Sequence, residues 1–203
     1  QKRIILLLTF FVLLEALIGA VIVVYEWVGL NSSSPRIIAV PLHLVNTFGL
    51  LGAYTLLFHL TKNLKNSMNN FFDRGFKIGL FLFLLSGATG SIAALADVIF
   101  PSESFIVGLT EDFDSNSEVL TRLRILHPIV ATALSAYLYS EANRLQKEYK
   151  IVTKNIKVLI LLAVFLGVLN VISNIILPLS ILHLLMADFL WVVYVDKSAE
   201  KIR

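Results

Sequence analysis

Six long apolar runs, separated by short polar segments, make up most of this chain. They fall at about residues 4–29, 37–61, 76–100, 121–140, 157–177 and 179–195. A helix needs about 20 apolar residues to cross the hydrocarbon core of a bilayer. The runs are continuous and do not alternate between apolar and polar residues, which favours helices over strands. The pattern predicts an all-α, polytopic membrane helical bundle with six transmembrane helices, the last of which is short.

Two prolines indicate where the later helices begin and end. Pro128 directly follows His127, and a helix tolerates proline well only in its first turn. We therefore expect a helix to begin near Leu126. Pro178 lies between the last two runs, and we expect it to act as a tight hinge between them.

Basic residues gather on one side of the predicted membrane. Fourteen of the 17 Lys and Arg residues fall at the two termini or after the second and fourth runs. The exceptions are Arg36, Arg122 and Arg124, on the side that also carries the acidic loop 103–118. Because cytoplasmic loops are rich in Lys and Arg, we expect both termini to be cytoplasmic, in a bacterial-type inner (plasma) membrane whose lipid surrounds the chain.

Composition supports the membrane interpretation. Of 203 residues, 57% are hydrophobic and 15% are charged, and the mean hydropathy is +0.82. A soluble domain of this length cannot bury so much apolar surface. The absence of cysteine excludes disulfides and thiolate metal sites. The small net charge of +3 gives no indication of nucleic-acid binding.

Three of the four histidines open apolar runs at one depth, near the predicted outer face of the membrane. They are His43, His127 and His183. Imidazole is costly to bury in a membrane, and it commonly holds a metal or a proton there. All three are therefore candidate metal ligands. The fourth, His59, lies beside Lys62 at the inner end of its run, and we interpret it as an interfacial side chain that reaches toward water.

Small residues accompany two of these histidines. Ala131 and Ala187 lie one turn after His127 and His183, which leaves space for a flat macrocycle but also suits plain helix packing. The third run carries a further small-residue face, which serves either close helix packing or one wall of a cofactor slot. Its members are Gly87, Gly90, Ser91 and Ala94.

Charged and polar residues elsewhere in the runs need partners. Arg122 and Arg124 precede His127 on the outer side. They are suited either to anions such as haem propionates or to lipid phosphates and the acidic loop. For Asn170, Asn174 and Asp188 we expect hydrogen bonds between helices, which is the common role of such residues in membranes.

The runs also form a partial internal repeat. The first and last pairs each contain a glycine and then, after a short outer turn, a His-Leu dipeptide early in the second run. The middle pair differs, with a Gly-rich first run and a long acidic loop. We therefore expect a helical hairpin in residues 1–65 and a four-helix bundle in 76–203, and we expect that a hairpin of the middle kind precedes residue 1.

The segments EALIGA, HLVNTF, RLRILHP and LHLLMADFLW, in this order, resemble the haem A synthase family of cytochrome oxidase assembly proteins. The family fold is two similar four-helix bundles, each with two histidines that hold a haem near the outer face. The resemblance implies that His127 and His183 are the axial ligands of a haem b cofactor. It also implies that His43 belongs to a bundle for the substrate, haem O, whose methyl group the family oxidises to the formyl group of haem A.

The chain departs from the family in two respects. The hairpin that supplies the partner of His43 and a catalytic carboxylate is absent from this sequence, so no catalytic residue is assigned. The family's usual His-Arg is His127-Pro128 here, and Arg124 is the expected replacement for the propionate contact, with Arg122 beside it.

These observations support a haem A synthase-like oxidoreductase, with three further interpretations open. One is a non-enzymatic haem-binding subunit for electron transfer or assembly that associates with a respiratory complex. A second is a haem-free transporter or scaffold with packing histidines. A third, a di-haem quinol oxidoreductase, needs histidine pairs at both faces. Expected protein partners are haem O synthase, a terminal oxidase complex or a second copy of the chain.

Overall fold

The long apolar runs form helices, as the sequence predicts. The computed structural model describes residues 2–62 and 71–202, and no strand occurs among them. In chain order the elements are α1 (Lys2–Val24), α2 (Ser34–Lys62), α3 (Arg74–Ile99), α4 (Phe105–Phe113), α5 (Val119–Leu123), α6 (Leu126–Tyr149), α7 (Lys154–Ile172), α8 (Leu177–Ala199) and the 3-10 turn η2 (Glu200–Ile202). With α5 and α6 counted as one span, six of the described helices are long and apolar enough to cross a membrane, which confirms an all-α membrane protein.

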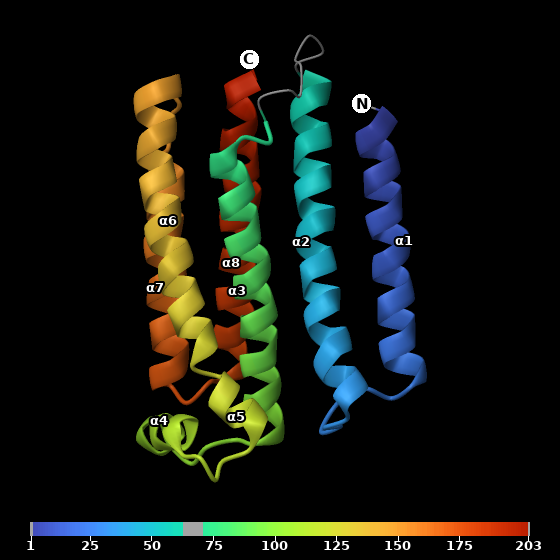
Figure 1. The fold of residues 1–203 in the computed structure, drawn as a ribbon, viewed down its shortest axis with the longest axis vertical. Helices are drawn as coiled ribbons and strands as arrows, with labels where there is room; N and C mark the ends of the chain where they lie inside the picture. Colours follow the sequence, from blue (N-terminus) through green and yellow to red (C-terminus); the bar gives the residue numbers. More distant parts are fainter. Residues whose placement is uncertain (1, 63–70, 203) are drawn as a thin grey trace.

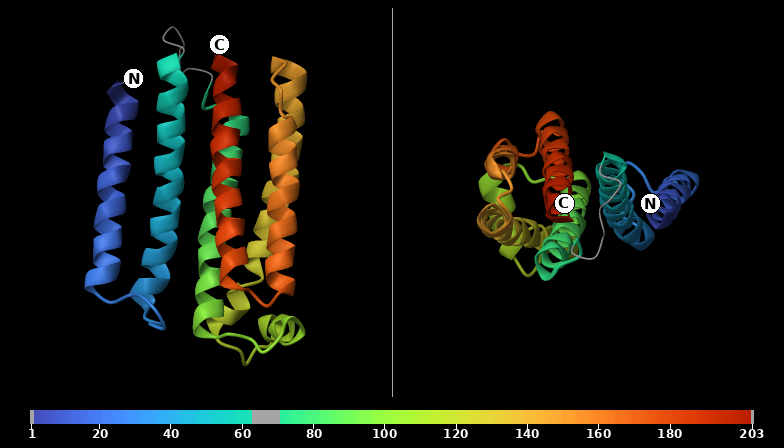
Figure 2. Two further views of the ribbon diagram at one scale, coloured as in Figure 1. Left: turned by 180° about the vertical axis from the view of Figure 1, so that it is seen from behind. Right: turned by 90° about the horizontal axis from the view of Figure 1, so that it is seen from above.

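Four helices form a ring, and a helical hairpin lies against it. α3 packs on α6, α6 on α7 and α7 on α8, while α2 packs on both α3 and α8. α1 packs on α2, on the side away from the ring (Figure 2). The hairpin and the ring correspond to the two units expected in residues 1–65 and 76–203. One buried core runs through both, so their division into separate domains stays a prediction.

All the long helices run roughly parallel to one axis, so the molecule has two ends. The N- and C-termini lie together at one of them, called here the terminal end (Figure 1). The opposite end carries the connections 25–33, 100–125 and 173–176, with α4 and α5. We call it the histidine end because His43, His127 and His183 lie in the first three turns of helices that begin there.

The first helix ends earlier than its apolar run. α1 stops at Val24, whereas the run was expected to continue to residue 29. Glu26 adopts a positive φ of 55°, and the Trp27 N–H donates to the Ile22 carbonyl at 2.9 Å. This is a Schellman-type cap, which terminates a helix through its backbone conformation. Hydropathy carries no signal for that turn.

The connection between the last two helices also differs from the expectation. α7 ends at Ile172, and Asn174 and Ile175 both have a φ of 57°, so the turn lies before Pro178. Pro178 itself is in the first turn of α8, where proline is well tolerated. The predicted Pro178 hinge is therefore wrong. α8 has 23 residues and is a full-length span. The predicted start of α6 at Leu126 is confirmed.

Aromatic side chains fill the ring toward the terminal end. Trp191 of α8 lies 4.8 Å from Phe83 of α3, and Tyr194 lies 5.7 Å from Phe76, measured between ring centroids. The Trp191 indole N–H donates to the Phe48 carbonyl of α2 at 2.8 Å. Buried aromatic pairs of this kind contribute about 0.5–1.5 kcal/mol each beyond their area burial. This cluster therefore fixes the spacing of α3 and α8 and joins the hairpin to the ring.

An ion network closes the terminal end. The Asp73 carboxylate caps α3 by accepting from the Phe76 N–H at 2.8 Å, and it pairs with Arg144 of α6 at 2.7 Å and with Lys201 of η2 at 2.8 Å. Arg144 also pairs with the buried Glu141 at 2.6 Å. Burial raises the pKa of Asp73, but the hydrogen bonds from Lys201, Phe76 and Arg144 outweigh it, so the pKa lies below its usual value.

Removing the Asp73 carboxylate tests this network. Asp73→Ala loses the cap and both ion pairs, and we expect a loss of about 1–3 kcal/mol in the free energy of unfolding. Asp73→Asn keeps a capping oxygen and should lose less. Because the folded-state pKa is depressed, the carboxylate stabilises the fold above its unfolded pKa, and this stability disappears as pH falls through the folded pKa.

The measurement is thermal unfolding in detergent at neutral and acidic pH. The unsubstituted protein should lose more stability on acidification than Asp73→Asn does. Equal losses would show that the carboxylate is not the group that links stability to pH.

Candidate functional site

His127 and His183 face one another inside the ring. His127 is the second residue of α6, and His183 lies in the second turn of α8. These two helices occupy opposite corners of the ring (Figure 2). The imidazole centroids are 6.2 Å apart, and the ring planes meet at 78°. The structure thus brings together two of the three histidines that the sequence indicates.

A glycine on the neighbouring helix lies behind each of these imidazoles. A Cβ atom added at Gly90 of α3 would be 2.9 Å from Cε1 of His127, and one added at Gly167 of α7 would be 3.0 Å from Cε1 of His183. Such distances leave no room for a larger residue unless the imidazole moves. Gly90, a member of the small-residue face predicted on α3, therefore packs closely against the His127 imidazole. Gly87 instead faces Phe48, as plain helix packing requires.

The Nδ1 edges of the two imidazoles lie near the backbone of neighbouring helices. Within the described chain, Nδ1 of His127 and Nδ1 of His183 are buried and form no hydrogen bond of ordinary geometry. The backbone of Ser86 lies beside the first ring and that of Ala163 beside the second. In metal sites the nitrogen that does not bind the metal commonly donates to a backbone carbonyl, which orients the other nitrogen. The two histidines are placed for that arrangement.

The pair fits the axial positions of a haem better than it fits a bare ion. An imidazole nitrogen binds a metal at about 2.0–2.1 Å, so two imidazoles on opposite sides of one iron have centroids about 6 Å apart; the observed distance is 6.2 Å. Across residues 2–62 and 71–202, no group of three or more His, Cys, Asp or Glu side chains is placed to hold a metal ion. A bare ion needs more protein ligands than two, whereas a haem iron needs only its axial ligands.

His43 lies apart from this pair, on α2. It faces Gly19 of α1, where an added Cβ would be 3.7 Å from the imidazole Cε1. All three histidines thus lie against a glycine of the preceding long helix, which is the structural form of the repeat. The His43 side chain is 37% exposed, but its Nδ1 is buried. The exposed part of the ring is therefore not its Nδ1 edge.

A carboxylate on α1 lies beside His43. Glu15 Oε2 is 3.6 Å from His43 Nδ1. Its two oxygens accept hydrogen bonds from Asn46 Nδ2 at 2.5 Å and from Thr47 Oγ1 at 2.6 Å. The sequence places His43, Asn46 and Thr47 on one helical face, but it does not show that this face meets Glu15.

His59 is not the water-reaching side chain that the sequence predicts. It is 4% exposed, and its Nδ1 lies 3.2 Å from Asp196 Oδ1 of α8. The packing of α2 on α8 brings the two residues together, although they are 137 positions apart in the chain. His59 is at the terminal end, so it belongs to a different level of the molecule from the other three histidines.

The two arginines of the α5 segment have different environments. Arg124 is buried and pairs with Asp97 at 2.9 Å, Asp112 at 2.8 Å and Glu111 at 3.3 Å. Pairing with the acidic loop, one of the two alternatives, is therefore what the structure shows, and no donor of Arg124 is left over for a propionate. Arg122 is exposed, and in the described part of the chain its side chain forms no hydrogen bond.

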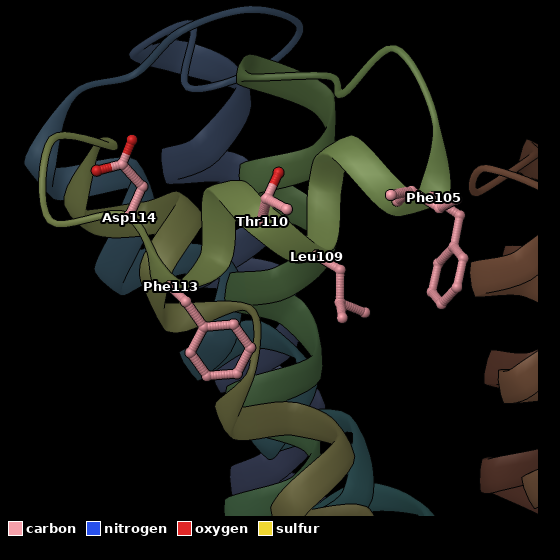
Figure 3. A pocket seen from close by; sticks show the side chains of 6 residues that line it. Phe105, Leu109, Thr110, Phe113 and Asp114 are labelled. Atoms are coloured by element: carbon pink, nitrogen blue, oxygen red, sulfur yellow. The ribbon is translucent and has the colours of Figure 1, made fainter.

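The acidic loop contains a helix that the sequence did not indicate. α4 is amphipathic: Thr110 and Asp114 point away from the membrane-spanning helices, whereas Leu109 and Phe113 point toward them (Figure 3). Together with Phe105 and Ile106 they line a shallow pocket. Since Glu111 and Asp112 bind Arg124, the ion pairs hold α4 across the histidine end. Nine residues are too few for a pattern search aimed at membrane spans.

Of the three residues expected to form hydrogen bonds between helices, Asn170, Asn174 and Asp188, only the first does so within the described chain. Asn170 accepts a hydrogen bond from Ser180 of α8 at 3.2 Å, which is the predicted bond between helices. Asn174 lies outside α7 and donates to the Ser102 carbonyl. Asp188 Oδ1 is buried and, among the described residues, has no hydrogen-bond partner, so no bond to a neighbouring helix is seen there.

The fold and the site define a polytopic membrane protein that holds an imidazole pair within a four-helix ring. A model of the cytochrome oxidase assembly protein family matches residues 1–195. The chain belongs to this family, which is that of the haem A synthases, and the resemblance seen in its motifs is confirmed.

Two curated relatives carry a different name. Both are described as protoheme IX farnesyltransferase and come from two strains of Thermus thermophilus. Each is 29% identical to this chain over 194 residues, which cover 92% of this chain and 32% of the relative. The chain thus spans about a third of the length of the curated relatives it matches. No solved structure matches the chain.

Replacing Arg124 tests the ion-pair cluster that holds α4 across the histidine end. Arg124→Met leaves Asp97 and Asp112 partly buried without a counter-charge, and we expect it to lower the free energy of unfolding by about 3–5 kcal/mol. Arg122→Met is the matched control, because replacing an exposed arginine whose side chain forms no hydrogen bond among the described residues should change stability by less than about 0.5 kcal/mol. Thermal unfolding in detergent measures both. Equal melting temperatures for the two variants would contradict the assignment of Arg124 as the centre of this ion-pair cluster.

Proposed function

We propose that this chain is a haem A synthase-like membrane oxidoreductase that holds a haem b between His127 and His183. The observation that carries this proposal is the facing imidazole pair, 6.2 Å apart and backed by two glycines. Membership of the cytochrome oxidase assembly protein family supports it. A bis-histidine haem supplies one-electron transfer when it is bound.

The chain's own residues would divide the work of holding that haem. His127 and His183 bind the iron through the nitrogens that do not face Ser86 and Ala163. Gly90 has no side chain, so the His127 imidazole can lie close against α3. We assign the propionate contact to Arg122, which is exposed at the same end of the four-helix ring, because a guanidinium binds carboxylates well.

We propose haem O as the substrate, with His43 as one ligand of the substrate site. The name of the curated relatives describes transfer of a farnesyl group to protohaem, which is chemistry on the same class of molecule. This supports a haem with an added isoprenoid as substrate and haem O synthase as a partner. Oxidation of a methyl group to a formyl group, with water as the oxygen source, releases four electrons and four protons. The haem between His127 and His183 would carry these electrons to an external acceptor.

We also propose that the histidine end faces the outside of a bacterial inner membrane. The positively charged terminal end then lies in the cytoplasm, as the positive-inside bias predicts. Both haem sites are placed near the outer leaflet by this orientation.

The haem ligands are tested by substitution. Purified protein loaded with haem should show the spectrum of a low-spin, six-coordinate b-type haem, and His127→Ala or His183→Ala should abolish that spectrum because one axial ligand is lost. His59→Ala is the control, since His59 is at the opposite end. An unchanged spectrum in haem-loaded His183→Ala would overturn the proposal.

The glycine wall gives a more sensitive test. Gly90→Ala places a methyl group within 2.9 Å of the His127 ring and should displace it, so we expect haem affinity at this site to fall by about tenfold or more, equivalent to about 1.4 kcal/mol. Gly19→Ala is the matched control, because its methyl group would make only an ordinary 3.7 Å contact with His43. Haem titration followed by absorbance measures both variants. Equal affinities would argue against a cofactor at the His127 ring.

Turnover separates the enzyme from a non-enzymatic haem subunit. We expect cells that make haem O but lack their own haem A synthase to accumulate haem A when they carry the full-length gene. Extracted haems identified by mass spectrometry give the answer. A haem-loaded protein that yields no haem A would instead support the electron-transfer or assembly role.

A further inference from the structure

We propose that Glu15 is a positioning residue for His43: its carboxylate accepts the Nδ1–H and so fixes the tautomer and orientation of the imidazole that binds the haem. This inference rests on the proposed function in one respect, namely that His43 binds a haem. The juxtaposition of Glu15 Oε2 and His43 Nδ1, at 3.6 Å, is the observation from which it starts.

The position of Glu15 is fixed from both sides. Asn46 Nδ2 donates to one carboxylate oxygen at 2.5 Å and Thr47 Oγ1 donates to the other at 2.6 Å. Asn46 also donates to the Phe11 carbonyl at 3.0 Å, and Thr47 to the His43 carbonyl at 3.1 Å. Because residues three and four positions apart share a helical face, α2 presents His43, Asn46 and Thr47 together to one carboxylate.

The orientation of the imidazole fits this role. The Nδ1 edge of His43 is buried and turned toward Glu15, while 37% of the side chain is exposed elsewhere. A ligand bound to the exposed part of the ring would therefore leave Nδ1–H free for the carboxylate. The 3.6 Å separation is longer than an ordinary hydrogen bond, so the contact would shorten when the histidine binds a metal.

Glu15 makes the His43 site different from the other pair. The backbone of Ser86 lies beside the His127 ring and that of Ala163 beside the His183 ring. Among the described residues neither of these imidazoles pairs with a carboxylate, whereas His43 has one beside it. A carboxylate that accepts from a ligating imidazole raises the basicity of that ligand. A more basic ligand favours ferric over ferrous iron, so the haem at His43 should have a lower midpoint potential than it would have beside an uncharged acceptor.

A purely structural role for Glu15 is the competing explanation. A carboxylate in a membrane helix is costly and is usually retained for function or for a bond between helices, and Glu15 does bond α1 to α2. The two roles predict different results. A structural bond affects only stability, whereas a positioning residue also affects the electronic properties of the haem.

Glu15→Gln tests the inference in purified full-length protein loaded with haemin. Spectroelectrochemical titration should resolve two haem components, and the component lost in His43→Ala identifies the haem at that site. We expect Glu15→Gln to raise the midpoint potential of this component by about 59 mV, which is a tenfold change in ferric over ferrous preference for one electron. The His127–His183 component should not shift.

Asn46→Ala is the matched control. It removes hydrogen bonds between α1 and α2 but leaves the charge of Glu15, so it should lower the melting temperature without raising the potential as far. An unshifted potential in Glu15→Gln, with a loss of stability like that of Asn46→Ala, would overturn the inference. If His43→Ala loses no haem component, the failure lies instead in the proposed function of His43.

Discussion

Polar side chains inside a membrane span must find their partners within the protein, because hydrocarbon offers none. This constraint accounts for several hydrogen bonds between helices in this chain. Asn170 bonds Ser180 across α7 and α8, and Asn46 bonds Glu15 across α1 and α2. Each bond joins two helices that composition alone would leave free to slide past one another. A small number of polar positions therefore adds directional bonds to the apolar packing of these helices.

The three histidines near the histidine end have a different kind of environment. Their Nδ1 edges are buried against backbone or, for His43, against a carboxylate, and glycines bring the neighbouring helices close behind the rings. Glycine is the residue that permits such an approach, since it has no Cβ. The same combination occurs in three hairpins, α1–α2, α3–α6 and α7–α8. Two of these hairpins close on each other, and that closure is what sets His127 opposite His183.

Much of this arrangement could be predicted from the sequence. Apolar runs of membrane length gave the all-α fold, Pro128 gave the start of α6, and the spacing of the histidines gave their common depth. These features are local, so a single sequence contains them. The features that the sequence did not show depend on contacts between distant segments. His59 is buried because α2 packs on α8, which carries Asp196. Arg124 has no donor left over because α4 brings Asp112 and Glu111 to it beside Asp97 of α3.

The ring and the α1–α2 hairpin differ in how firmly their helices are held. Ion pairs hold the ring α3–α6–α7–α8 at both ends: those of Asp73 with Arg144 and Lys201 at the terminal end, and those of Arg124 at the histidine end. The spacing of His127 and His183 is therefore fixed from both ends. The α1–α2 hairpin has one side against the ring and leaves α1 exposed along its length. A pair of imidazoles fixed from both ends, as in the ring, would suit the resident electron carrier proposed for that site.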